Sequence, residues 1–128
     1  MSKLNESSNK KFFFKNFSEF YPFYLSQHAN DINRLFHYIG TFITLIIYVY
    51  VGFTLNFVYL FYAPIMGYGF AWFGHYFFEK NKPATFKYPF FSLAADYVMF
   101  TRFVLGKTFT DFNKYNIKNI KNIPILYI

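Results

Sequence analysis

The side chains of this sequence best suited to chemistry are its three histidines, His28, His37 and His75. Each histidine lies beside the edge of a long apolar segment rather than at its centre. The sequence contains no cysteine, which excludes thiolate nucleophiles and Cys-based zinc or iron–sulfur sites within it. Imidazole nitrogens suit iron or zinc, whereas magnesium and calcium prefer oxygen ligands. If the three histidines converge, we expect them to bind a transition metal.

Two carboxylates could join this cluster. Glu79 follows His75 by four residues, so the two side chains would share one face of a helix. Asp96 lies in the middle of a later apolar segment. One carboxylate with two histidines can form a non-haem iron site, and a carboxylate can also orient a ligating imidazole. The candidate catalytic residues are His28, His37, His75, Glu79 and Asp96, with the three histidines as candidate metal ligands.

Two long apolar segments must position these residues. Residues 32–55 predict a helix that begins near Asn30 or Asp31, and residues 57–78 predict a second helix after a short uncharged turn. About 20 apolar residues suffice to cross the hydrocarbon core of a bilayer, which is roughly 30 Å thick. Gly67, Ala71 and Gly74 form a stripe of small residues, typical of close packing between helices. An antiparallel hairpin would bring all three histidines to the same end.

The remaining apolar segments are shorter. Aromatic residues spaced by three and four along residues 17–27 predict an amphipathic helix, expected to lie on the membrane with its aromatic face toward lipid. Residues 89–105 contain Asp96 and Arg102, and one charge at mid-bilayer costs about 2.5–3.5 kcal/mol. We therefore expect that segment to be re-entrant or interfacial. The predicted fold is all-α: an integral membrane helical bundle with a two-helix transmembrane hairpin and interfacial or re-entrant helices.

The composition agrees with a membrane protein. Hydrophobic residues make up 55% of the chain and charged residues 15%, and the net charge is +7. The lysines flank the apolar segments, which indicates membrane orientation and contact with anionic lipid rather than binding of nucleic acid. The positive-inside rule places the N-terminus and residues 79–88 in the cytoplasm. We expect a polar segment over residues 1–16, a membrane-embedded catalytic domain over 17–106 and a basic tail over 107–128.

Several cations near the same end could hold a substrate. Arg34, Lys82, Lys87 and Arg102 could bind a carboxylate or a phosphate, although contact with lipid headgroups explains each of the two lysines more simply. The same composition fits a bacterial inner membrane or, in a eukaryote, the endoplasmic reticulum. It leaves the oligomeric state open.

Longer sequence motifs extend this interpretation. Residues 20–28 (FYPFYLSQH), 33–41 (NRLFHYIGT) and 69–86 (GFAWFGHYFFEKNKPATF) resemble a membrane family named for the metabolism of phytosphingosine to odd-numbered fatty acids. The resemblance covers roughly residues 17–100. It implies an Fe(II)-dependent dioxygenase that shortens 2-hydroxy fatty acids by one carbon through α-oxidation, with dioxygen as the co-substrate. The family's histidines correspond to His28, His37 and His75, and its supporting positions correspond to Glu79, Asn81 and Asp96, of which Asn81 is also a candidate to bind substrate.

Two other function classes stay open at this point. The chain could be a non-catalytic membrane protein that packs or scaffolds lipids, with histidines that merely lie at the interface. It could also be a zinc-dependent membrane hydrolase, for which Glu79 would serve as the general base. The metal content of the purified protein distinguishes the three classes.

Overall fold

The structure is a computed structural model that describes residues 14–117, and every regular element in that range is helical. The elements, in chain order, are α2 (Phe17–Ser26), α3 (Asp31–Thr54), the 3-10 segment η1 (Phe57–Phe61), α4 (Tyr62–Gly74), the π-helical turn η2 (His75–Glu79), the 3-10 turn η3 (Ala84–Phe86), α5 (Pro89–Val104) and α6 (Thr108–Lys114). The prediction of an all-α chain is confirmed.

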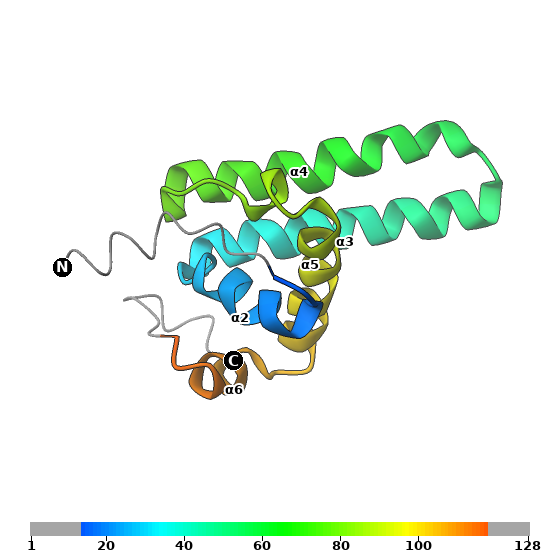
Figure 1. The fold of residues 1–128 in the computed structure, drawn as a ribbon. Coiled ribbons are helices and arrows are strands. Elements are labelled where there is room, and N and C mark those ends of the chain that lie inside the picture. The colour runs from blue at the N-terminus through cyan, green and yellow to red at the C-terminus, as the bar shows by residue number, and fades with distance from the viewer. Residues whose placement is uncertain (1–13, 118–128) are drawn as a thin grey trace.

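The long hairpin is formed by α3 and by the continuous run from η1 through α4 to η2, which lie antiparallel (Figure 1). Asn30 is the N-cap of α3, as expected, because its side-chain oxygen accepts hydrogen bonds from the N–H groups of Ile32 and Asn33. The chain reverses at Leu55, whose backbone is left-handed with φ 56°. Asp31–Thr54 and Phe57–Glu79 are each long and apolar enough to span a membrane, by length and composition.

Glycines bring the two arms of the hairpin into backbone contact. A Cβ on Gly40 would lie 3.1 Å from the Gly67 carbonyl oxygen and 3.2 Å from the Phe70 Cβ. A Cβ on Gly74 would collide with the Asn33 side chain and would lie 3.2 Å from the Asn33 Cα. The close packing expected from the small-residue stripe is therefore confirmed at Gly67 and Gly74. Because His75 follows Gly74 directly, this contact also fixes the distance of His75 from α3.

Gly74→Ala is expected to destabilise the protein, because the added methyl group must push α4 away from the backbone of α3. Overpacking of this kind costs about 1–3 kcal/mol. The matched control is Gly69→Ala on the same helix, where a Cβ meets nothing within 4 Å and alanine favours the helix. Thermal unfolding in detergent should show a lower midpoint for Gly74→Ala than for Gly69→Ala. Equal midpoints would contradict the close contact.

The other helices pack against one side of the hairpin, and α5 runs across it (Figure 1). The aromatic face of α2 is buried among α5, α6 and Tyr38, with Phe20 at 0% and Tyr24 at 1% exposure. The expectation that this face meets lipid is wrong, because the aromatic rings form the core of the protein. Residues 108–114 of the expected tail form α6, and residues 1–13 and 118–128 lie outside the described residues.

Candidate metal centre

The three histidines meet at the open end of the hairpin. His28 follows α2, His37 lies in the second turn of α3, and His75 begins the π-helical turn. Their ring centroids lie 4.4–4.8 Å apart, and one nitrogen of each ring lies within 4.8 Å of the other two. All three side chains are buried, with exposures of 0%, 5% and 1%. The arrangement places three imidazoles around one small, buried volume.

Hydrogen bonds at Nδ1 establish the tautomers of His28 and His37. The Nδ1 of His28 lies 2.6 Å from the Tyr24 carbonyl oxygen, which can only accept, so this nitrogen carries the proton. The Nδ1 of His37 lies 3.0 Å from a carboxylate oxygen of Asp96, which accepts in the same way. Asp96 also accepts a short hydrogen bond from the Tyr24 hydroxyl. In the neutral form, both imidazoles therefore turn an unprotonated Nε2 toward the centre.

His75 is held in the same manner by Asn81. The Nδ1 of His75 lies 2.6 Å from the Asn81 Oδ1, while the Asn81 amide nitrogen donates to the Gln27 carbonyl oxygen at 3.0 Å. This second bond orients the amide so that its oxygen faces the ring. The π-helical turn and the left-handed backbone of Lys80, with φ 60°, bring Asn81 back to His75. π-helical turns of this kind often occur at functional sites.

The resulting cluster fits a divalent transition metal. The Nε2 atoms of His28 and His37 lie 3.2 Å apart, and neither carries a proton in the tautomers that their partners impose. Two lone pairs at that distance repel unless a cation lies between them. Burial, with the neighbouring charges of His37 and His75, holds the pKa of His28 well below its usual value. A proton on His28 is therefore disfavoured as the cation between the two Nε2 atoms. Neutral imidazoles are the form that binds iron or zinc.

A buried cation and a half-buried carboxylate hold the loop that presents His28. The guanidinium of Arg34 donates to the carbonyl oxygens of His28 and Ala29, at 2.7 and 3.0 Å, and forms an ion pair with Asp31. The Glu79 carboxylate accepts from the N–H groups of Ala29 and Asn30, at 3.1 and 2.8 Å. The polar backbone groups of this buried loop are thus satisfied from both sides.

The structure separates the predicted site residues into distinct groups. Asp96 lies behind His37 and contacts the ring at Nδ1, while Glu79 faces the backbone of the His28 loop. Arg34 is engaged with that loop and with Asp31, and Arg102 forms a bidentate ion pair with Asp111 on α6. Asn81 orients His75. Lys82 is exposed on the following loop.

Tyr24 is the site residue that sequence reasoning missed. Its ring stacks on His28 with centroids 4.0 Å apart, its carbonyl oxygen holds His28, and its hydroxyl donates to Asp96. Burial and the nearby Asp96 charge raise the pKa of Tyr24 well above its usual value, so the phenol stays protonated as a donor. The available signal was the spacing, because Tyr24 precedes His28 by four residues at the end of a helix.

Asn81→Leu is expected to weaken metal binding by about 10–100-fold, because the hydrogen-bond partner that orients a ligating histidine is lost. Asn81→Asp keeps an oxygen that can accept from His75 and should retain more of the affinity. Metal titration of detergent-purified variants measures the difference. Equal affinity of Asn81→Leu and the unmodified protein would show that Asn81 does not position His75.

No curated protein and no solved structure matches the chain significantly. The model of one protein family, described as 2-hydroxy-palmitic acid dioxygenase Mpo1-like, matches residues 14–108 of the 128. The match includes the three histidines, Asn81, Asp96 and Tyr24. The family expected from the sequence motifs is therefore confirmed, and the chain belongs to the Mpo1-like family of 2-hydroxy-palmitic acid dioxygenases.

Proposed function

We propose that this protein is an Fe(II)-dependent dioxygenase that shortens 2-hydroxy fatty acids by one carbon at a membrane interface. The observation that carries the proposal is the convergence of three buried imidazoles, each with its Nδ1 bonded to an acceptor. The family's description supports the substrate class. The position of the site at the open end of an apolar hairpin supports the interface, where the acid group of a fatty acid meets water.

The net reaction balances with dioxygen as the only oxidant. The bond between C1 and C2 breaks, C2 is oxidised from a secondary alcohol to a carboxylic acid, and C1 leaves as carbon dioxide. One dioxygen is consumed and one water is formed. Iron held by His28, His37 and His75 would supply one-electron chemistry with dioxygen and affinity for the hydroxyl and carboxylate oxygens of the substrate.

The protein's own groups prepare this chemistry. Asp96, Asn81 and the Tyr24 carbonyl group keep the protons of the three imidazoles at Nδ1, which leaves the Nε2 lone pairs free for the metal. The carboxylate of Asp96 offsets part of the positive charge of a bound cation. Burial of the histidines excludes bulk water, which strengthens these electrostatic interactions.

The zinc hydrolase is less well supported, because neither Glu79 nor Asp96, the two carboxylates near the histidines, is free to act as its general base. Glu79 accepts hydrogen bonds from two backbone N–H groups and the Asn33 amide, and it faces the His28 loop. Asp96 is bonded to both His37 and Tyr24. The scaffold hypothesis does not explain why each buried histidine has its own acceptor at Nδ1.

The test combines metal analysis with product analysis. Protein purified anaerobically in detergent, with and without added Fe(II), is analysed by inductively coupled plasma mass spectrometry. The expected result is close to one iron per chain, followed by oxygen consumption with 2-hydroxy-palmitic acid and formation of the acid one carbon shorter. The 3-hydroxy isomer is the control, because its hydroxyl cannot form the same chelate. Zinc at that ratio would favour the hydrolase, and no metal after reconstitution would favour the scaffold.

A further inference from the structure

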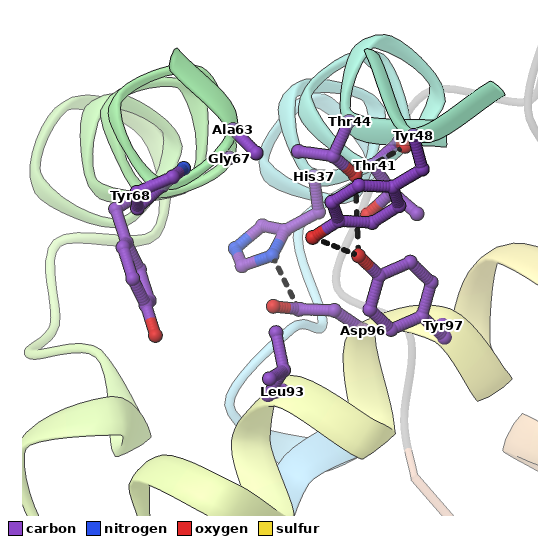
Figure 2. Close-up of a pocket in the computed structure, with 11 residues that line it drawn as sticks. His37, Thr41, Thr44, Tyr48, Ala63, Gly67, Tyr68, Leu93, Asp96 and Tyr97 are labelled. Carbon is purple, nitrogen blue, oxygen red and sulfur yellow. Dashed lines mark hydrogen bonds and ion pairs between the residues drawn. The ribbon is translucent and has the colours of Figure 1, made fainter. Parts of the chain in front are cut away.

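A pocket beside the metal centre continues away from the histidines into the hairpin. Its volume is about 160 Å³, and it lies between α3, α4 and α5 (Figure 2). His37 and Asp96 form the end nearest the metal centre, and Tyr48 lies farthest along α3. The eleven positions from 37 to 48 correspond to roughly 16 Å at 1.5 Å per residue. The pocket therefore begins at a metal-ligating residue and extends toward the closed end of the hairpin.

The hydroxyl groups of Thr44, Tyr97 and Tyr48, on one wall of the pocket, form a chain of short contacts. The Thr44 hydroxyl donates to the Thr41 carbonyl oxygen at 2.7 Å and lies 3.3 Å from the Tyr97 hydroxyl. The Tyr97 hydroxyl donates in turn to Tyr48 at 3.2 Å. Figure 2 shows these side chains on one wall, with Tyr68 on the opposite side. Because these hydroxyl groups are satisfied within the wall, an apolar occupant leaves none of them without a partner.

The size and charge of the pocket define its occupant more closely. A cavity of about 150 Å³ holds one benzene-sized apolar group, so this pocket accepts a segment of a single alkyl chain. Among the described residues that line it, none is Lys or Arg, and Asp96 brings a negative charge. Arg34 and Arg102 are engaged elsewhere. An acid group at the His37 end would therefore need a cation held by the three histidines to stabilise it, while the pocket itself would bind only the chain.

We propose that this pocket binds the alkyl chain of a single-chain 2-hydroxy acid, with the acid group at His37 and the chain directed along α3 toward Tyr48. The assignment rests on the proposed function for the identity of the acid. It matches the direction of the hairpin, since the chain points toward the end where Phe53, Phe57 and Phe61 present an apolar outer surface. Leu93, on α5, lines the pocket and is 44% exposed, so a larger side chain can be accommodated at this position.

Photolabelling tests the assignment without requiring turnover. The probe is 2-hydroxy-palmitic acid with a diazirine in the middle of its chain, bound anaerobically to the Fe(II)-loaded protein in detergent. After irradiation, peptide mapping should place the label on the pocket wall, at Thr44, Tyr68 or Tyr97. Leu93→Trp should reduce this label several-fold. The matched control is Val104→Trp, also on α5 but 65% exposed and outside the pocket lining, and it should label normally.

Each outcome decides the proposal. A second, more open groove between α3 and α4 is lined by Phe36, Phe70 and Phe73. Label in that groove, or equal labelling of the two tryptophan variants, would overturn the proposal. Competition by unlabelled 2-hydroxy-palmitic acid supports the acid as occupant, whereas competition by phospholipid alone would assign the pocket to a membrane lipid and overturn it. Oxygen consumption assayed in parallel separates the two proposals. If the pocket is labelled but the acid is not shortened, the proposed dioxygenase reaction is refuted and the pocket assignment stands. If the acid is shortened but the label lies elsewhere, the pocket assignment is refuted and the reaction stands.

Discussion

His37→Ala is expected to abolish metal binding, and with it all oxygen consumption, while the helices stay folded. Loss of a hydrogen-bond partner behind a ligand already costs about 10–100-fold in affinity, so loss of the ligand itself should exceed that range. The reason is geometric, because the two remaining imidazoles, from separate segments, leave one side of the cation without a protein ligand. The variant also leaves the Asp96 carboxylate in place without its histidine.

The measurement for His37→Ala combines metal content with thermal unfolding. A ligand at 100 times its Kd stabilises the folded state by about 2.7 kcal/mol, so Fe(II) should raise the unfolding midpoint of the unmodified protein but not of the variant. Helical content by circular dichroism verifies that the variant is folded. His28→Ala and His75→Ala should behave in the same way. Iron retained near one per chain in all three variants would rule out the histidine site.

Among the variants proposed for this protein, Arg34→Met is expected to cause the largest loss of stability. Arg34 is 1% exposed, donates to the carbonyl oxygens of His28 and Ala29, forms an ion pair with Asp31, and stacks over the Phe112 ring at 4.6 Å. Removing one partner of a buried ion pair costs about 3–5 kcal/mol, because the other charge stays buried without compensation. The His28 loop should loosen as a consequence, and metal affinity should fall together with stability.

Two further variants separate the causes of this loss. Arg34→Lys keeps the charge but cannot reproduce the planar fork that reaches two carbonyl groups and Asp31 together, so an intermediate loss is expected. Arg102→Gln removes an arginine whose side chain is 34% exposed, and the glutamine amide can still donate to the buried Asp111, so a smaller loss is expected. The unfolding midpoints in detergent should follow the order Arg102→Gln, Arg34→Lys, Arg34→Met, from highest to lowest. An Arg34→Met protein as stable as Arg102→Gln would contradict the proposed role of Arg34.

The candidate ligands could be predicted from the sequence because few residues were available. With no cysteine and three histidines beside apolar segments of membrane-spanning length, the hairpin itself brings His37 and His75 to one level. The N-cap at Asn30 and the close packing at Gly74 follow from local rules of helix capping and of small residues between helices. The family followed from motifs long enough to be specific.

The roles of the charged residues could not be predicted in this way. Sequence spacing on an ideal α-helix puts Glu79 beside His75, but the π-helical turn changes that register, and the carboxylate meets the His28 loop instead. The sequence leaves Arg34 available to bind a substrate carboxylate or phosphate, whereas in the fold its guanidinium is buried and donates to two carbonyl oxygens. The loop N–H groups that bond to Glu79 lie 49 and 50 residues away in the sequence. The carbonyl groups that Arg34 meets lie only five and six residues before it, but the turn between α2 and α3 must first bring them within reach.

By itself, then, the sequence determined the long helices up to residue 105, their apolar lengths and the three candidate ligands, because these depend on local periodicity and composition. It did not predict α6, which forms within the expected basic tail. Only the tertiary structure decided which nitrogen of each imidazole faces the centre. That choice depends on Tyr24, Asp96 and Asn81, which approach from three different segments. The pocket along α3 likewise exists only where α4 and α5 close around it. The Tyr24 contact is local, four residues from His28, but Asp96 lies 59 residues from His37 and Asn81 is oriented by Gln27 across 54 residues, so long-range contacts complete the arrangement.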